Sequence, residues 1–332
     1  MIALPKKYNQ YLNIVETELA IKAIKDMFED ELSIALNLIR VSAPLFVGKG
    51  SGVNDDLTGK EQPVTFFHKD IDDPLQIVHS LAKWKRLALR RYGFSAHQGL
   101  YTDMNAIRKD EVLDGIHSIL VDQWDWELII EKEERTLQTL QEIVSVIYDV
   151  LKKTSLMVES TFGITSNLPE KIVFVSSYEL EKLYPTLTPA LREYEFTKKH
   201  GAVFVMEIGD TLSDGNVHDF RAPDYDDWHL NGDLLVYYPL LDAAIELSSM
   251  GIRVDAARLF EQCIKANATD RLSLYFHQMC LDDQLPMTIG GGIGQSRMCL
   301  ILLQKAHIGE VQASTWPQEM IEACEAKGIF LL

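Results

Sequence analysis

Apolar residues recur at two spacings along the chain, and these spacings predict its helices and strands. Residues 13–38 and 132–162 carry apolar side chains every three or four positions, as amphipathic helices do. Compact apolar runs at 172–175, 202–208 and 234–238 are typical of buried strands. Further strands are predicted at 39–45, 64–68, 76–79, 116–122 and 246–253, and further helices at 80–91, 258–265, 271–281 and 295–303.

The predicted strands fall in groups between helices and do not alternate with them strictly. This order favours an α+β fold with a mixed, mainly antiparallel sheet flanked by helices. Pro44 interrupts the first strand and has no backbone donor, so we expect that strand at an edge or an interface. The sequence contains no repeat, low-complexity tract or linker, and we therefore expect one domain over residues 1–332.

Composition and charge narrow the class of protein. The 332 residues are 47% apolar and 24% charged, which are globular values, and they carry a formal net charge of -17. This acidity argues against a protein that coats nucleic acid, because phosphate binding needs clustered Lys and Arg. It leaves room for a local Arg cluster around one small phosphorylated ligand.

The ends and the cysteines predict a cytoplasmic protein without a membrane anchor. The N-terminus has no apolar run after a basic start, and no stretch reaches the roughly 18 apolar residues of a membrane span. The four cysteines are far apart and form no C-x-x-C pair, so we expect reduced thiols. Position 2 is Ile, which excludes an N-terminal cysteine nucleophile.

The glycine-rich segment at 290–294 is the strongest local signal. It predicts a turn before a helix, and helix N-termini with nearby glycines can bind anions. Arg297 adds a cation in the first helical turn, where an anion or an aromatic ring would have to offset it. A flexible turn before a core helix is an equally good interpretation of glycines alone. No Lys-Ser/Thr follows, so the segment is not a P-loop.

An acidic stretch at 210–233 is the second signal. It holds seven aspartates and Arg221, and no lysine. A solvated acidic loop is the plainer interpretation. Carboxylates beside an arginine and a glycine-rich segment also suit Mg²⁺ held against phosphates, because Mg²⁺ uses few protein oxygens.

A strand with polar residues on both faces is the third signal. Around 117–127 the alternation puts Asp122 on one face and Gln123 and Asp125 on the other. This pattern indicates a strand that ends in a site, although a strand frayed into solvent would look similar.

Together these segments resemble the three signature motifs of class II aminoacyl-tRNA synthetase catalytic domains. The N-terminal helix and the strand with Pro44 match the first motif. The strand–loop–strand that contains Arg108 and ends in Asp122 and Gln123 matches the second motif, and residues 290–297 match the third. The match is closer to the aspartate–ammonia ligases, the ammonia-dependent asparagine synthetases. This closer match rests on the amino-acid sequences of segments 78–86, 121–127, 221–228, 248–254 and 288–297.

The resemblance implies a homodimer formed through the first motif, with ATP, Mg²⁺, L-aspartate and ammonia as ligands and no tRNA. It implies catalytic roles for Arg108 on the α-phosphate, and for Asp55 and Gln123 near the amino group or the ammonia. Substrate-binding roles are implied for Ser80, Lys85, Asp125, Arg221, Asp226, Ser248 and Ser249. ATP-binding roles are implied for Arg108, Glu246, Arg253, Gly292, Gly294 and Arg297, and metal-binding roles for Asp233 and Glu246.

Three alternatives stay open at this point. A true aspartyl- or asparaginyl-tRNA synthetase would carry an appended basic anticodon-binding domain, for which the motifs leave no room. A catalytically inactive synthetase-like subunit should have lost the motif arginines or metal acids, which are present here. A glutamine-dependent asparagine synthetase would need the N-terminal cysteine nucleophile.

Overall fold

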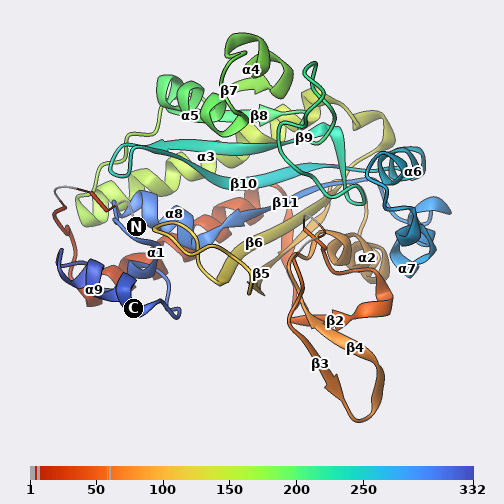
Figure 1. Ribbon diagram of the computed structural model, residues 1–332, viewed down its shortest axis with the longest axis horizontal. Coiled ribbons are helices and arrows are strands. Elements are labelled where there is room, and N and C mark those ends of the chain that lie inside the picture. The colour runs from red at the N-terminus through yellow and green to blue at the C-terminus, as the bar shows by residue number, and fades with distance from the viewer. Residues whose placement is uncertain (1–3, 6–7, 58, 60) are drawn as a thin grey trace.

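An eight-stranded sheet forms the centre of the protein in a computed structural model, which describes residues 4–5, 8–57, 59 and 61–332 (Figure 1). The strand order is β1 (Leu38–Arg40), β5 (Gly99–Ile107), β6 (Leu120–Ile129), β11 (Thr288–Gly294), β10 (Ala243–Arg253), β9 (Asp226–Tyr238), β8 (Ala202–Met206) and β7 (Val173–Ser176). The outermost pairs, β1–β5 and β7–β8, are parallel, and the pairs between them are antiparallel. The predicted α+β fold with a mixed, mainly antiparallel sheet is therefore confirmed.

One face of the sheet is sealed by helices and the other is open in its middle. Helices α1 (Ile14–Ala35), α3 (Leu137–Phe162) and α8 (Gln295–Leu302) pack with the strands in the main apolar core, around Trp124 and Trp126. On the other face α2 (Ala82–Tyr92) contacts β5, β6 and β11, while α5 (Pro189–His200) contacts β8, β9 and β10. Because α2 and α5 cover different strands, the β6–β11–β10 region between them can hold a ligand.

Shorter elements complete the chain. They are the helices α4 (Ser177–Leu183), α6 (Ala256–Lys265), α7 (Tyr275–Leu281) and α9 (Gln318–Glu325), and the 3₁₀ turns at Lys49–Ser51, Lys132–Glu134, Thr269–Ser273 and Ile308–Glu310. The predicted helix at 271–281 is thus divided, because the 3₁₀ turn ends at Ser273 before α7 begins. Within the described part of the chain, no helix is long and apolar enough to cross a membrane.

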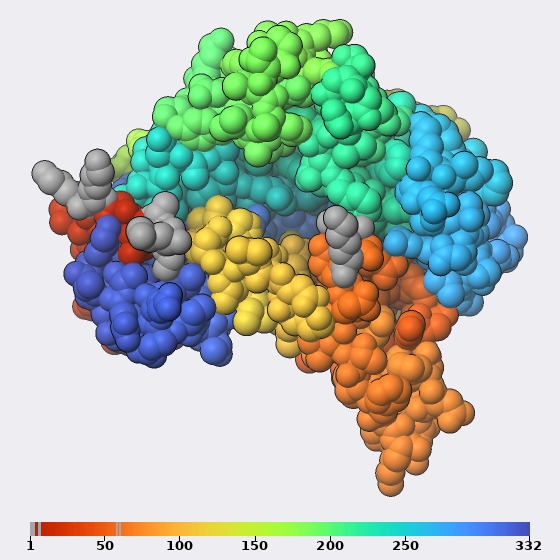
Figure 2. All heavy atoms as spheres, viewed as in Figure 1, coloured from red at the N-terminus to blue at the C-terminus, as the bar shows by residue number. Residues whose placement is uncertain are grey.

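A second, three-stranded sheet projects from the body as an arm (Figures 1 and 2). Its order is β2 (Phe46–Gly48), β4 (Ile71–Ile77) and β3 (Thr65–His68). The first strand predicted at 39–45 is wrong in its end: β1 stops at Arg40, and Pro44 lies between β1 and β2. The arm strands are mostly exposed, so little apolar periodicity marks them.

The glycine-rich segment is the main correction to the predicted elements. Residues 290–294 are not a turn but part of β11, which pairs with β6 on one side and β10 on the other. A side chain on Gly291 would meet the main chain and Cβ of β10 at Met250, and one on Gly290 would meet Glu127. The glycines are required because neighbouring strands and side chains approach this strand closely.

The prediction of one domain over 1–332 stays a prediction.

A capping box explains where α1 starts, because the side chains of Asn13 and Glu16 each accept a hydrogen bond from the other residue's backbone N–H. All four cysteines are buried and free, as the reduced state predicts.

Candidate active site

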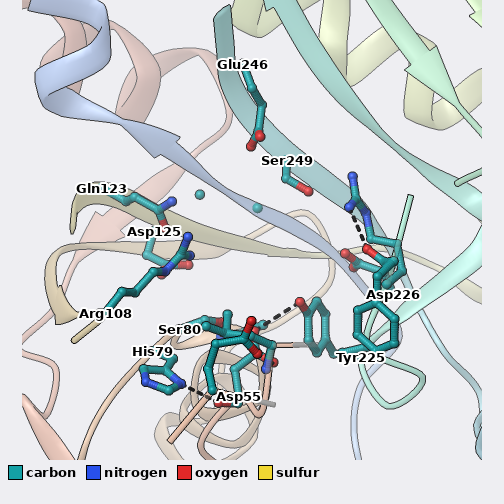
Figure 3. A pocket seen from close by; sticks show the side chains of 18 of the residues that line it. Asp55, His79, Ser80, Arg108, Gln123, Asp125, Tyr225, Asp226, Glu246 and Ser249 are labelled. Atoms are coloured by element: carbon teal, nitrogen blue, oxygen red, sulfur yellow. Dashed lines mark hydrogen bonds between the residues drawn. The ribbon is translucent and has the colours of Figure 1, made fainter. Parts of the chain in front are cut away.

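A cavity of about 320 Å³ lies on the open face of the sheet, between α2, the strands β6, β10 and β11, and residues of the segments 55–57, 61–62 and 220–226. Figure 3 shows polar side chains surrounding this space from several sides. Most predicted site residues line it: Asp55, Ser80, Lys85, Arg108, Gln123, Asp125, Arg221, Asp226, Glu246, Ser249, Arg253 and Gly292. Residues far apart in the sequence thus form one site, which we call the first cavity.

A second cavity of about 200 Å³ adjoins the first. Arg108, Gln123 and Glu246 line both cavities, while Gly294 and Arg297 line only the second. Of the residues predicted to bind nucleotide, Arg108 and Glu246 therefore lie at the junction and Gly294 and Arg297 in the second cavity, while Arg253 and Gly292 line only the first. Such an arrangement suits a ligand pair that meets at the junction, with one partner in each cavity.

Arg108 is the cation at this junction. It follows directly after β5, and its backbone N–H donates to the Ile119 carbonyl at 2.9 Å, which closes the strand–loop–strand. Its Nε atom is buried and has no hydrogen-bond partner among the described residues. An arginine without a committed partner between two cavities is suited to bind an anionic group there.

Arg297 lies in the first turn of α8, directly after β11, and lines the second cavity. Its Nη1 donates to the Glu246 carbonyl at 3.0 Å and lies 3.8 Å from a carboxylate oxygen of Glu246. The N-terminus of α8 is itself held by Asp122, which accepts from the Ser296 N–H at 3.1 Å and from its hydroxyl at 2.7 Å. The position of Arg297 is therefore fixed by β6 and β10.

Lys85 lies under the first cavity and is fully buried. Its ammonium contacts the Asp125 carboxylate and donates to the carbonyls of Trp126 at 2.9 Å and Gly291 at 3.0 Å. Three N–H donors of a lysine are thus occupied by protein acceptors. Lys85 consequently orients Asp125 and the glycine-rich strand from below.

Arg253, which the resemblance predicts to bind nucleotide, is held by two carboxylates under the first cavity. It is buried and donates to both carboxylate oxygens of Glu127, at 2.8 and 2.6 Å, and to Asp226. Burial alone would raise the pKa of Glu127, but Arg253 outweighs it and lowers that pKa. Arg253 lines the first cavity and not the second, so the geometry gives it a supporting position beneath the substrate side.

Arg221, which lines the first cavity, forms an ion pair with Asp233, which does not. One Asp233 oxygen is bound by Arg221, and the other is buried without a partner among the described residues. Burial raises the pKa of Asp233, and nearby Glu246 adds to this, while Arg221 opposes it. Asp233 itself lines neither cavity.

A β-bulge in β10 lies just before the two predicted serines and sets which of them faces the first cavity. The register shifts between Glu246 and Ser248, and Ser249 then faces the first cavity. Ser248 instead donates its hydroxyl to the Gly292 carbonyl at 2.9 Å and does not line the cavity. Ser248, which the resemblance predicts to bind substrate, therefore does not face the first cavity.

Asp55 lies on the side of the first cavity opposite Ser249 (Figure 3). Its carboxylate accepts from the Tyr225 hydroxyl at 3.1 Å and from the Leu57 N–H at 2.9 Å. Burial raises the pKa of Asp55 above its ordinary value. Its backbone carbonyl also lies 3.0 Å from Nδ1 of His79, so the segment before α2 fixes its position.

Glu127 and Tyr225 are among the residues in and around this site that were not predicted from the sequence. Glu127 binds Arg253 and lies 3.6 Å from Lys85, and Tyr225 binds Asp55. The alternation along 117–127 would have placed Glu127 on the same face as Gln123 and Asp125. Tyr225 carried no such signal, because it stands in a stretch without periodicity.

The fold is that of class II aminoacyl-tRNA synthetases. The asparaginyl-tRNA synthetase of Entamoeba histolytica in complex with asparaginyl-adenylate superposes with a TM-score of 0.63 at 14% identity, covering 90% of this chain and 66% of that one. The asparaginyl-tRNA synthetase of Pyrococcus horikoshii, also with asparaginyl-adenylate, gives a TM-score of 0.59 at 14% identity, covering 90% and 70%. At such identities the likeness shows the fold alone.

The chain belongs to the aspartate–ammonia ligase family, whose sequence model matches residues 15–328. An aspartate–ammonia ligase from Clostridium perfringens strain SM101 is 60% identical over 331 residues, covering 99% of this chain and 98% of the relative. Another from Levilactobacillus brevis is 56% identical over 333 residues, covering 100% and 99%. The predicted family is confirmed, and with it an ATP-dependent ligase that uses aspartate and ammonia.

Proposed function

We propose that the two adjoining cavities carry out amide formation through a β-aspartyl adenylate. L-Aspartate would occupy the first cavity and ATP the second, meeting at Arg108. The observation that carries this assignment is that Arg108, Gln123 and Glu246 line both cavities. The products would be L-asparagine, AMP and pyrophosphate.

The chemistry explains why the two substrates must meet. A free carboxylate resists attack by an amine because it has no leaving group. In the proposed sequence a β-carboxylate oxygen attacks the α-phosphorus of ATP and pyrophosphate leaves. Ammonia then attacks the β-carbon, the carbon–oxygen bond to the phosphate breaks, and AMP departs with that oxygen.

Arg108 is proposed to stabilise the charge that builds on the α-phosphate oxygens. Its uncommitted Nε at the junction supports this role. A fixed donor at such a position is worth about 3–4 kcal/mol of transition-state stabilisation. Arg297 and the backbone near Gly292 and Gly294 are proposed to hold the rest of the nucleotide.

The buried charges under the first cavity support a site for the substrate's α-ammonium group. Among the described residues, three buried carboxylates (Asp125, Glu127 and Asp226) form ion pairs with two cations, Lys85 and Arg253. An aspartate α-ammonium near Asp125 would complete this balance, since buried charges need partners. Arg253 is thus proposed as part of the support for the substrate site and not as a ligand of ATP.

The remaining wall residues are proposed to bind the other groups of aspartate. Arg221, whose buried Nε has no partner among the described residues, would bind the α-carboxylate. Asp55, Ser80, Gln123 and Ser249 line the same space and would contact the amino group or the incoming ammonia.

Mg²⁺ is proposed to enter with the phosphates of ATP. Among the described residues, no group of three or more His, Cys, Asp or Glu side chains could hold a metal ion alone. Glu246 at the junction and the unpartnered oxygen of Asp233 are nevertheless suitable donors for an ion that takes its other ligands from phosphate and water. When bound, Mg²⁺ would neutralise phosphate charge.

A homodimer through the first motif is also proposed. Its support is a set of exposed apolar side chains on α1 and β1: Ile14, Val15, Leu19, Ile34 and Ile39. Exposed apolar residues gathered in one region are typical of an interface. The cytoplasmic location and the absence of a tRNA substrate stay predictions.

One assay tests the proposal. The protein is incubated with ATP, Mg²⁺ and aspartate, with either ammonium or glutamine, and asparagine, AMP and pyrophosphate are measured. We expect equal amounts of the three products with ammonium and almost none with glutamine. ADP and phosphate in place of AMP would contradict the adenylate, and charged tRNA in a parallel filter assay would favour the synthetase alternative.

A further inference from the structure

Asp122, near the start of β6, accepts hydrogen bonds from four donors. Its Oδ1 atom accepts from the Ser296 N–H and from Nε2 of Gln312, each at 3.1 Å. Its Oδ2 atom accepts from the Ser296 hydroxyl at 2.7 Å and from Nζ of Lys25 at 3.2 Å. A carboxylate has about four acceptor sites, so these donors occupy all of them. Asp122 lines the second cavity, but its oxygens are already taken by the protein.

Helix α8 depends on Asp122 for the cap of its first turn. The N-cap residue is Gly294, which has no side chain to accept a hydrogen bond from the helix. The Ser296 N–H is one of the backbone donors that the first turn of a helix leaves unpaired. Asp122, 174 positions away in the sequence, takes the place of an N-cap side chain, and its negative charge lies at the favourable end of the helix dipole.

The same contacts fix the start of Arg297. Arg297 follows Ser296 directly, within the first turn of α8. Ser296 and Gln312 are both buried, and Nε2 of Gln312 also donates to the Ser296 hydroxyl at 3.1 Å. Asp122, Ser296 and Gln312 therefore form a closed set of hydrogen bonds at the root of the arginine. A shift of this turn would move the Arg297 guanidinium away from its place in the second cavity.

The four donors explain why a carboxylate is required at position 122. Asparagine has one acceptor oxygen, while its amide nitrogen only donates. In Asp122→Asn, that nitrogen would face donors at Ser296 and at Lys25 or Gln312. The replacement also removes the carboxylate that forms an ion pair with Lys25 of α1.

We propose that Asp122 is a positioning residue for ATP binding, which holds the first turn of α8 so that Arg297 reaches the nucleotide in the second cavity. The inference rests on the proposed function, because it takes Arg297 as a ligand of ATP. Asp122 acts through Arg297 and not by contact with the nucleotide. Lys25 holds the carboxylate from the side of α1 and thereby links that helix to the ATP side of the site.

Steady-state formation of asparagine from aspartate, ATP and ammonium gives the first test. We expect Asp122→Asn to raise the KM for ATP about tenfold, because the arginine is no longer held in its binding position. The KM for aspartate, which is proposed to bind in the first cavity, should not change. An equal rise in both KM values would overturn the inference, since it would show a general loss of structure.

A double-mutant cycle with Arg297→Ala separates positioning from a merely structural role. If Asp122 acts through Arg297, Asp122→Asn should raise the KM for ATP in the parent protein and leave it unchanged in Arg297→Ala. The same factor in both backgrounds would overturn the inference. Arg297→Ala alone should raise the KM for ATP at least as much as Asp122→Asn does. An unchanged KM in Arg297→Ala would instead contradict the proposed binding of nucleotide by this arginine, and with it the role of Asp122.

Lys25→Met keeps the test decisive if Asp122→Asn does not fold. This lysine is partly exposed, and we expect the KM for ATP to rise about two- to fivefold, the effect of one partly exposed ion pair. The matched control is Lys22→Met, on the same helix, whose ion pair with Asp26 lies within α1, and it should leave this KM unchanged. An unchanged KM for ATP in Asp122→Asn, or in Lys25→Met where the first variant does not fold, would overturn Asp122 as a positioning residue.

Discussion

Arg253 and Glu127 form a two-pronged ion pair beneath the first cavity, with Nε donating to Oε1 at 2.8 Å and Nη2 to Oε2 at 2.6 Å. The Thr288 hydroxyl donates to the same Oε1 at 2.7 Å, so three strands of the sheet converge on this carboxylate. Because both partners are buried, the pair acts as a support on which Lys85 and Asp226 are also aligned.

Replacement of Glu127 by glutamine should destabilise the protein strongly. Glu127→Gln keeps the shape but leaves Arg253 with an incomplete counter-charge, and breaking a buried pair costs about 3–5 kcal/mol. The free energy of unfolding in urea measures this loss. Glu133→Gln, at an exposed position, is the control and should change it by less than about 0.5 kcal/mol. A similarly small loss in Glu127→Gln would contradict the supporting role.

Arg108→Ala should remove most of the adenylation activity. The rate of aspartate-dependent pyrophosphate release is expected to fall about 100- to 1000-fold, because the α-phosphate charge loses its fixed donor. Arg91→Ala, at an exposed position on α2, should leave this rate intact. Normal turnover in Arg108→Ala would remove Arg108 from the reaction.

Asp55→Asn should slow amide formation. The neutral amide can no longer balance a cationic amino group or ammonium at the wall, and we expect at least a tenfold lower rate of asparagine production, typical for loss of a positioned proton-transfer group. Tyr225→Phe removes only the hydrogen bond to Asp55 and should have a smaller effect. Asparagine formation at the parental rate in Asp55→Asn would show that this carboxylate has no part in the reaction.

His307 should make stability depend on pH between about 6.5 and 4. Burial lowers the pKa of His307 from 6.5 to about 4, and its Nδ1 accepts from the Gly309 N–H at 3.0 Å. The unfolded chain therefore binds a proton in this range that the folded chain refuses, so this contribution is full above pH 6.5 and is lost as pH falls towards 4.

Urea unfolding at several pH values measures this dependence. The difference in unfolding free energy between the parent and His307→Phe should shrink by roughly 1–3 kcal/mol from pH 7 to pH 4. A difference that stays constant over this range would show that His307 is protonated equally in both states.

The sequence predicted most of the sheet because buried strands and long helices leave periodic apolar patterns. Residues 202–208 and 132–162 were placed correctly to within a few positions. The glycines at 290–294 were placed in a turn because local propensity excludes them from strands. Only the close approach of Met250 and Glu127, which lie far away in the sequence, explains why β11 needs them.

Most of the residues predicted for the site line the two cavities, and their individual roles stay predictions. The resemblance brought Asp55, Arg108 and Gln123 to one cavity, as the structure shows. Sequence cannot show which partner holds an arginine, so the pairing of Arg253 with Glu127 was not predicted. It also cannot show a bulge, and the bulge in β10 decides that Ser249 and not Ser248 faces the cavity.

Transfer of oxygen from aspartate tests the adenylate at this site most directly. Aspartate labelled with ¹⁸O in its β-carboxylate is converted with ATP, Mg²⁺ and ammonium in unlabelled water, and the products are examined by mass spectrometry. Attack of the β-carboxylate on the α-phosphorus predicts one ¹⁸O atom in AMP and none in pyrophosphate. Unlabelled AMP, or ¹⁸O in pyrophosphate or phosphate, would contradict the account.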